Sequence, residues 1–242
     1  MQKRKLTKRN MDHDIAENLQ AVRKDIAESE QKSGRTAGSV ELVAVSKTHP
    51  PEAIRQAVEA GQLLFGENRI QEAKAKIPDL PAKIRWHLIG HLQSNKIRQA
   101  LPLFEMIHGV DSLELLDGIQ RIASEHGLFP RVLLQVNVAG ESSKFGFAPE
   151  RLLSEVERIS RAERVQVEGL MTIPPLASDP ENSRRYFVQL RRLRDRLEEE
   201  FRFPLPHLSM GMSGDYRVAV EEGATLVRVG TAIFGNRRAK GQ

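Results

Sequence analysis

The sequence contains no cysteine, and this absence excludes several kinds of chemistry. Without a thiol the chain can form no disulfide, no thiolate metal site and no cysteine nucleophile. No apolar run approaches the roughly 18 residues of a membrane helix, and the basic N-terminus lacks the apolar core of a signal peptide. We therefore expect a cytoplasmic protein that does not bind membranes.

Negative charge is missing from both ends of the chain. Residues 1–10 hold five Lys or Arg and no acid, and residues 237–242 hold three and no acid. These eight charges exceed the net charge of +5, so the body between them is mildly acidic. Such a body is a poor electrostatic match for DNA or RNA. We expect residues 1–10 and 237–242 to be basic, disordered tails, and no nucleic-acid partner.

The length and composition fit one large domain. The chain has 242 residues, close to the roughly 250 of a (β/α)8 barrel. Its hydrophobic content of 40% is enough for a sizeable core, and no linker-like stretch divides it. We therefore expect a single domain over residues 11–236.

Strand-like and helix-like segments alternate along the chain. Eight short apolar runs are each followed by a helical pattern or a final turn, and they cover residues 42–45, 63–65, 85–90, 106–110, 131–138, 165–172, 207–210 and 226–229. One further helix, capped by Asp12 or Asp14, precedes them. This alternation implies parallel strands with right-handed crossovers. Because no glycine-rich dinucleotide fingerprint follows any strand, we predict an α/β protein: a (β/α)8 TIM barrel with one extra N-terminal helix.

Lys47 ends the first predicted strand and precedes a polar turn, Thr48 to Pro51. Taken alone, it is more simply a solvated strand end. It is also placed to be an amine at the mouth of the barrel, where the sites of this fold lie. A buried lysine loses its proton easily, and a neutral amine can attack a carbonyl to form a Schiff base.

The loops after strands seven and eight are where such barrels commonly bind phosphate. Hydroxyl groups, glycines, a cation and the start of a short helix occur there: Ser209, Gly211, Ser213, Gly214, Asp215, Arg228, Gly230 and Thr231. Each has an ordinary structural explanation, and Arg228 could face inward or outward. Together, opposite a strand-end lysine, they indicate a ligand with a phosphate and a carbonyl. Pyridoxal phosphate and a phosphosugar aldehyde or ketone both qualify.

Seven segments, in order, carry a family resemblance: residues 43–47, 65–68, 86–96, 136–137 with 144–146, 169–171, 208–215 and 227–235. On these segments the chain resembles the pyridoxal phosphate homeostasis protein family, the single-domain barrel relatives of alanine racemase. They run from about residue 41 to 236, nearly the whole predicted barrel. The basic extension at residues 1–10 lies outside the family's usual start.

The resemblance implies a set of cofactor-binding residues. Lys47 would hold pyridoxal 5'-phosphate as an aldimine. The phosphate would be bound by Ser209, Ser213, Gly230 and Thr231, with Gly214 in the same loop. Arg228 matches an arginine that faces the pyridine nitrogen in the related racemase barrel. Asn68, His87 and Met171 would line the site, and Lys96 would lie near its mouth.

The resemblance also implies a function: a protein that holds and delivers pyridoxal phosphate inside the cell, without turnover and without catalytic residues. Apo enzymes that need the cofactor would be its partners, and we expect a monomer. Two alternatives stay open, an amino-acid racemase and a Schiff-base aldolase. The racemase needs a tyrosine base, for which only Tyr216 is placed, because Tyr186 lies on an apolar helix stripe. The scattered histidines suggest no metal site.

Overall fold

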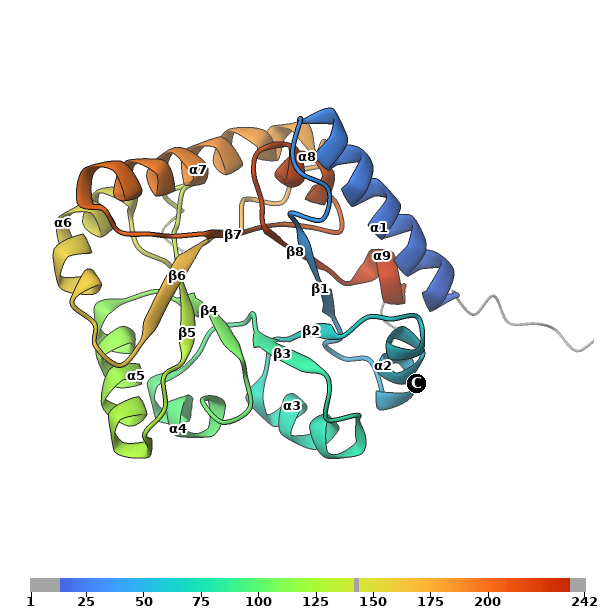
Figure 1. Ribbon diagram of the computed structural model, residues 1–242, viewed down its shortest axis with the longest axis horizontal. Coiled ribbons are helices and arrows are strands. Elements are labelled where there is room, and N and C mark those ends of the chain that lie inside the picture. The colour runs from blue at the N-terminus through green and yellow to red at the C-terminus, as the bar shows by residue number, and fades with distance from the viewer. Residues whose placement is uncertain (1–13, 142–143, 236–242) are drawn as a thin grey trace, which may run out of the picture.

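The protein is a parallel barrel surrounded by helices (Figure 1). The structure, a computed structural model, describes residues 14–141 and 144–235. Each strand pairs with the next in the chain, and β1 pairs with β8 to close the barrel. The strands are β1 (Glu41–Val45), β2 (Leu64–Glu67), β3 (Arg85–Leu88), β4 (Met106–Val110), β5 (Arg131–Gln135), β6 (Gln166–Met171), β7 (His207–Met212) and β8 (Leu226–Val229). The predicted fold class is confirmed.

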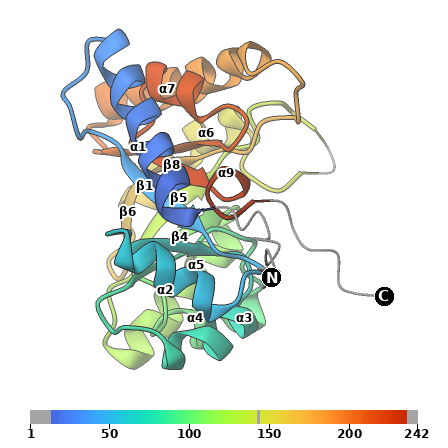
Figure 2. The ribbon, with the colours of Figure 1, turned by 90° about the vertical axis from the view of Figure 1, so that its right-hand side faces the viewer.

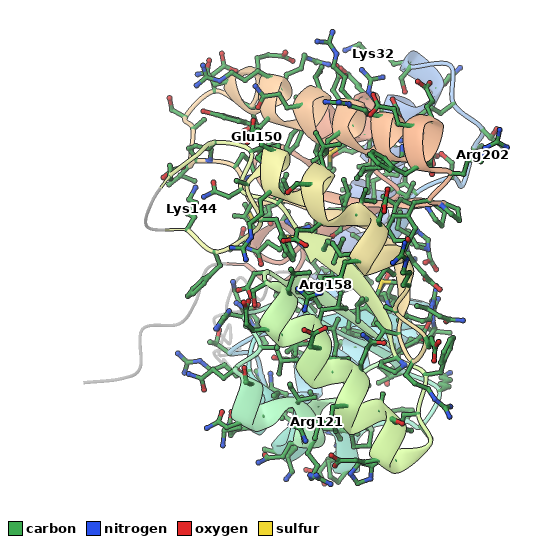
Figure 3. All side chains as sticks on the ribbon, turned by 90° about the vertical axis from the view of Figure 1, so that its left-hand side faces the viewer. Lys32, Arg121, Lys144, Glu150, Arg158 and Arg202 are labelled. Carbon is green, nitrogen blue, oxygen red and sulfur yellow. The ribbon has the colours of Figure 1, made fainter. Side chains whose placement is uncertain are left out.

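Helices follow the strands and cover the outside of the barrel. They are α1 (Ile15–Lys32), α2 (Pro51–Glu59), α3 (Ile70–Lys76), α4 (Ile97–Ala100), α5 (Leu113–His126), α6 (Pro149–Ser160), α7 (Glu181–Phe201), α8 (Tyr216–Glu221) and α9 (Thr231–Phe234), with 3-10 turns at Ile77–Asp79 and Ser94–Lys96. Charged side chains such as Arg121 and Arg158 are exposed on these helices (Figure 3). No helix in the described part of the chain is long and apolar enough to cross a membrane.

The extra helix α1 packs against α8 and α9, the last two helices of the barrel (Figure 2). Asp14 caps it by accepting hydrogen bonds from the N–H groups of Ala16 and Glu17. The Asn18 amide donates to the carbonyl of Ile233 in α9 at 2.9 Å. These contacts join α1 to the segment from β7 to α9. This segment contains the loops that we predict to bind phosphate.

Alternate strand residues face two separate apolar layers. In β1, Leu42 and Ala44 belong to the layer between the strands and the helices. Val43 and Val45 belong to a smaller cluster inside the barrel. Because side chains alternate along a strand, Lys47 continues the inward row.

A network of ion pairs lies at the amino ends of the strands, opposite the predicted site. Arg85 contacts Glu41 at 2.9 Å and Glu105 at 2.8 Å. Arg131 contacts Glu105 at 2.8 Å and Glu168 at 2.7 Å. These side chains are partly exposed, so they contribute modestly to stability. They bridge β1 to β6 at this end of the barrel.

Some predicted boundaries differ from the structure. The fifth strand ends at Gln135 rather than residue 138, because the following backbone pairs with Phe147 of the next loop. Helix α7 begins at Glu181, one or two residues before the predicted start at Asn182 or Ser183. Both predicted tails, residues 1–10 and 237–242, lie outside the residues that the structure describes.

Candidate functional site

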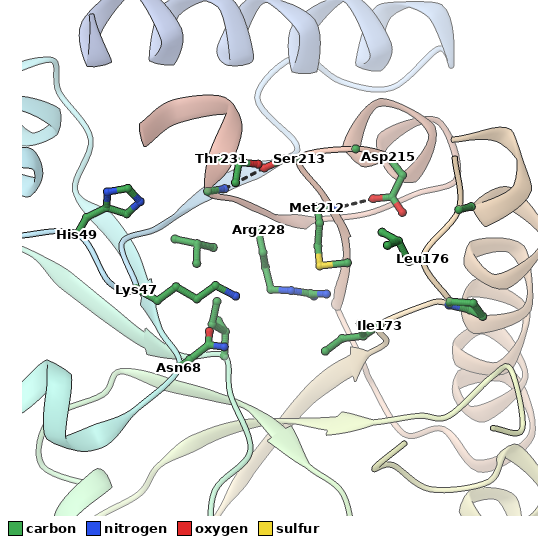
Figure 4. Close-up of a pocket in the computed structure, with 16 residues that line it drawn as sticks. Lys47, His49, Asn68, Ile173, Leu176, Met212, Ser213, Asp215, Arg228 and Thr231 are labelled. Atoms are coloured by element: carbon green, nitrogen blue, oxygen red, sulfur yellow. Dashed lines mark hydrogen bonds between the residues drawn. The ribbon is translucent and has the colours of Figure 1, made fainter. Parts of the chain in front are cut away.

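A cavity of about 360 Å³ opens at the carboxyl ends of the strands (Figure 4). The structure brings seven predicted site residues to its wall: Lys47, Asn68, Ser213, Gly214, Arg228, Gly230 and Thr231. Lys47 follows β1, Asn68 follows β2, and Arg228 lies in β8. The cavity therefore collects side chains from strand ends that are distant in sequence but neighbours in the closed barrel.

Lys47 and Arg228 enter this cavity from neighbouring strands (Figure 4). In the register of the barrel, Val43 of β1 pairs with Arg228 of β8. Arg228 is 4% exposed. Its guanidinium donates to the Ser209 hydroxyl at 2.5 Å and to the Thr172 carbonyl at 2.9 Å. The question whether Arg228 faces inward or outward is thereby answered: it faces the inside.

Burial lowers the pKa of Arg228 to about 10, although the nearby Asp215 carboxylate opposes this shift. The guanidinium is therefore still charged at neutral pH. A buried cation is costly to leave without polar partners. Ser209 and Thr172 supply two of them and leave the cation in the cavity wall, where it can meet an anionic or electron-rich group.

The loops that we predict to bind phosphate lie on the same wall. The N–H groups of Gly230 and Ala232 donate to the Ser213 hydroxyl oxygen at 3.1 and 3.4 Å. Gly230 is packed closely, since a Cβ added there would lie 3.3 Å from both the Cβ and the carbonyl oxygen of Val45. Ser213 and Thr231 thus place hydroxyl groups beside backbone N–H donors, as a phosphate site requires.

Gly211 explains how β7 leads into this wall. Its φ is +90°, and an added Cβ would lie 2.5 Å from the Cβ of Ala219 and 3.0 Å from the Cα of Tyr216. Only glycine fits such a conformation and such contact. Helix α8 can therefore pack directly on the end of β7. Its N-cap residue, Asp215, turns back and accepts a hydrogen bond from the Met212 N–H at 2.7 Å.

Three predicted site residues do not reach the cavity. Ser209, His87 and Met171 are at most 1% exposed, and none belongs to the cavity wall. Met171 packs in the inner apolar cluster with Val43 and Ile89. The Ser209 hydroxyl accepts a hydrogen bond from Arg228 in the interior of the barrel, and Ser209 does not line the cavity with the loops after β7 and β8. Lys96, expected near the mouth, is likewise absent from the wall.

Buried histidines extend the contacts of Arg228 into the barrel. His108 Nδ1 lies 2.9 Å from the Ser209 hydroxyl, and His108 Nε2 lies 2.9 Å from His87 Nδ1. Arg228 can only donate. The fewest buried groups stay unpaired if Ser209 donates to His108 Nδ1 and His108 Nε2–H donates to His87. His87 Nε2 then carries a proton, and it has no hydrogen-bond partner among the described residues.

Burial lowers the pKa of both histidines, that of His87 to about 3 and that of His108 well below its usual value. Both rings are therefore neutral at physiological pH. His108 is a residue that sequence reasoning missed. It lies in the strand Met106–Val110, where a lone histidine among apolar residues is the only sign of a polar contact inside the barrel.

Sequence reasoning also missed the apolar part of the cavity wall. This part includes Val45, Ile89, Ile173, Pro175, Leu176 and Met212. The Pro174–Pro175 pair after the sixth strand was an available signal, because it marks a loop at the carboxyl end of the barrel. Such a wall suits the flat face of an aromatic ligand.

Two observations on polar side chains indicate which kinds of ligand the site can bind. The Asn68 side-chain oxygen is buried without a hydrogen-bond partner among the described residues, so it can accept a hydrogen bond from a ligand. Among the same residues, no cluster of three or more His, Asp or Glu side chains could hold a metal ion. The arrangement can hold a ligand that combines an anionic group with a group reactive towards an amine.

Comparisons with known proteins agree with this geometry. The profile of the alanine racemase N-terminal domain family matches residues 17–238. A pyridoxal phosphate homeostasis protein of Aquifex aeolicus is 44% identical over 223 residues, which covers 92% of this chain and 98% of that protein.

Solved structures show the same relationship. PipY of Synechococcus elongatus, solved without and with bound pyridoxal phosphate, is 43% identical. The match covers 91% of this chain and 100% of PipY, with TM-scores of 0.83 and 0.80. An alanine racemase of Clostridium difficile shares the fold at 16% identity and a TM-score of 0.73, and the match covers 94% of this chain but 60% of the racemase. On the identity and coverage of these matches, this chain belongs to the pyridoxal phosphate homeostasis protein family.

Proposed function

We propose that this protein binds pyridoxal 5'-phosphate in the cavity at the carboxyl end of the barrel. The observation that carries the proposal is the convergence of Lys47 and Arg228 on one cavity beside Ser213 and Thr231 (Figure 4). PipY, solved with this cofactor bound, supports the choice of ligand over a phosphosugar.

The cavity fits the cofactor in size and polarity. Its volume of about 360 Å³ is within the range of small-molecule sites, about 300–1,000 Å³. The unpartnered Asn68 oxygen is an acceptor for a donor on the bound ligand, and the cofactor ring carries a hydroxyl group. Ser213, Gly214, Gly230 and Thr231 are the residues that would hold the phosphate, while Ser209 instead contacts Arg228.

Lys47 is the residue that we propose as the covalent anchor. Its neutral amine would add to the aldehyde carbon, forming a carbon–nitrogen bond. The carbonyl oxygen would leave as water together with the two amine protons, so the step needs no further reactant. Hydrolysis by water reverses it and releases the cofactor, which is what a carrier requires.

Arg228 is the residue that we propose opposite the pyridine nitrogen. Because an arginine only donates hydrogen bonds, the nitrogen would stay unprotonated and the ring would be a weaker electron sink. This property limits carbanion stabilisation, but it does not distinguish a carrier from a racemase, because the related racemase barrel has an arginine at the matching position.

We propose accordingly that the protein holds and delivers the cofactor within the cytoplasm, acts as a monomer and has no turnover of its own. Apo enzymes that require pyridoxal phosphate would be the recipients. The curated relatives are named as homeostasis proteins, which supports this role. The runner-up is an amino-acid racemase, but the one tyrosine considered for it, Tyr216, is not part of the cavity wall.

The direct test is to locate the bond to the cofactor. The wild-type protein mixed with pyridoxal phosphate should show the visible absorption band of a protonated imine, and borohydride should abolish that band. Peptide mapping of the reduced protein should find the pyridoxyl group on Lys47. Lys47→Met should lose band and label, whereas the control Lys96→Met should keep both. A label mainly on Lys96, or on any other lysine, would contradict the assignment.

The carrier role has a separate test. The loaded protein is mixed with an apo enzyme whose activity requires the cofactor, and recovery of that activity is followed over time. If the protein delivers the cofactor directly, the activity of the apo enzyme should recover faster than the cofactor dissociates from the protein. The dissociation rate is measured separately with a small molecule that traps free cofactor. Recovery only at the dissociation rate would reduce the role to storage.

A further inference from the structure

Lys76, the last residue of α3, buries its ammonium group behind the end of the barrel. Its side chain is 8% exposed. The nitrogen donates to the carboxylates of Glu67 at 2.9 Å and Glu72 at 2.6 Å, and to the Ser46 carbonyl at 2.9 Å. We call Lys76, Glu67 and Glu72 the Lys76 cluster. None of its members belongs to the cavity wall.

One side of the cluster holds the residue before Lys47. The Ser46 hydroxyl donates to Glu67 at 2.7 Å, and the Ser46 carbonyl accepts from Lys76. Ser46 and Glu67 are each 0% exposed. Glu67 also directly precedes Asn68, which lies in the cavity wall. Side chains alternate at a strand end, so the residues bound by the cluster face outward and their neighbours face the cavity.

The other side of the cluster holds the residue after Lys47. The Thr48 N–H donates to Glu72, on the same carboxylate oxygen that accepts from Lys76. Thr48 has a φ of +68°. For a β-branched residue this left-handed conformation is an outlier that its surroundings must enforce. Glu72 accepts from the Thr48 N–H in this strained turn, and the His49 N–H closes the turn by donating to the Ser46 carbonyl at 3.1 Å.

We propose that Lys76 is a positioning residue for Lys47: through Glu67 and Glu72 it fixes Ser46 and Thr48, and so aims the Lys47 amine into the cavity. The inference rests on the proposed function, since it assigns Lys47 a reaction. It goes further by giving a role to an ion-pair cluster outside the cavity. Buried ion pairs are weak sources of net stability, so a positional role explains this cluster better than a contribution to stability.

The test variant must not leave a buried charge without a partner. Lys76→Met alone would strand the Glu67 carboxylate, whose pKa burial already raises. We therefore combine Lys76→Met with Glu67→Gln, which removes the charges of Lys76 and Glu67 and keeps an acceptor for the Ser46 hydroxyl. The Glu72 carboxylate stays, but its side chain is 22% exposed and still accepts from the Thr48 N–H. Lys74→Met is the matched control, because Lys74 lies on the same helix but is exposed. Thermal unfolding of each variant verifies that it is folded.

Two ligands separate positioning from general damage to the site. Pyridoxal phosphate reports how fast the imine forms, and pyridoxine 5'-phosphate, which has no aldehyde, reports binding without a bond to lysine. Misplacing a reacting amine is expected to slow imine formation by about tenfold or more. The affinity for pyridoxine 5'-phosphate should stay about the same, and Lys74→Met should change neither.

Each outcome decides the matter. A wild-type rate of imine formation in the double variant would overturn the proposal. An equal loss for both ligands would also overturn it, since the cluster would then merely support the pocket. If the wild-type protein itself forms no imine, the proposed function fails instead. The cluster is then judged by hydrogen exchange of the Thr48 amide: faster exchange in the double variant supports the clamp, and unchanged exchange overturns it.

Discussion

The Tyr216 hydroxyl donates a hydrogen bond to the Asp25 carboxylate of α1, outside the barrel. Asp25 also pairs with Arg217 at 2.6 Å. Burial, followed by the contact with Asp25, raises the pKa of Tyr216 to about 12. The tyrosine considered for acid–base chemistry therefore joins α1 to α8 and has a pKa poorly suited to proton transfer near neutral pH.

The first prediction is that Tyr216→Phe costs stability in a pH-dependent way. Burial alone would raise the pKa of Asp25, but the hydrogen bonds from Tyr216 and Arg217 lower it on balance. The stabilisation is therefore present above the ordinary aspartate pKa and is lost as the pH falls through the lowered one. Urea unfolding should show a loss of roughly 1–2 kcal/mol at neutral pH that shrinks in acid. Tyr186→Phe is the control, and a loss independent of pH would contradict this account.

The second prediction is catalytic silence towards amino acids. A racemase needs acid–base groups on both faces of the substrate, and Tyr216 faces α1. We expect no α-hydrogen exchange in deuterated water, for a panel of amino acids, at enzyme-like rates of about 1 per second or faster. Tyr216→Phe should not alter the slow background. Fast exchange that disappears in this variant would favour the racemase.

The sequence predicted correctly which side chains face the inside of the barrel. It predicted less well how far each lies from the cavity at the carboxyl ends of the strands. The three predicted residues that miss the cavity, His87, Met171 and Ser209, are all buried inside the barrel. Two other residues line the cavity instead: Ile89, two positions after His87, and Ile173, two positions after Met171. Alternation along a strand gives the direction of a side chain. Its depth depends on the stagger between strands, which a local pattern does not contain.

Lys47 and the loops after β7 and β8 were predictable because their signals are local. An apolar strand that ends in lysine, and glycines beside hydroxyl residues after the last two strands, can be read directly along the chain. The Lys76 cluster was not predictable in this way. Its contacts join α3 to the ends of β1 and β2, and only the closed barrel brings these segments together.

The third prediction concerns the buried histidines. The unfolded chain binds a proton at His87 below a pKa of about 6.5, whereas the folded protein binds it only below about 3. The contribution of His87 to stability should therefore fall with falling pH across this window and stay level above it. His87→Gln removes one titrating group and should reduce the slope of unfolding free energy by about 1.4 kcal/mol per pH unit. His126→Gln, at the exposed end of α5, is the control; an equal slope in wild type and His87→Gln would show that the ring is not buried neutral.

The last prediction is a discrimination between two forms of the ligand. Ser213→Ala with Thr231→Ala removes two neutral hydroxyl donors, each worth roughly 0.5–1.5 kcal/mol. The affinity for pyridoxal phosphate, measured by titration, should fall about tenfold. The loss is larger if the N–H groups of Gly230 and Ala232, which now donate to Ser213, also shift.

Pyridoxal without phosphate provides the internal comparison. It should bind the wild-type protein much more weakly, and its affinity should be the same in the double variant, because neither hydroxyl has a phosphate to meet. Ser160→Ala, an exposed serine at the end of α6, should change neither ligand. Equal affinity of the wild-type protein for pyridoxal and pyridoxal phosphate would contradict a phosphate-binding site on this wall of the cavity. The site would then be organised around Lys47 and Arg228 alone, and the loops after β7 and β8 would have only a structural role.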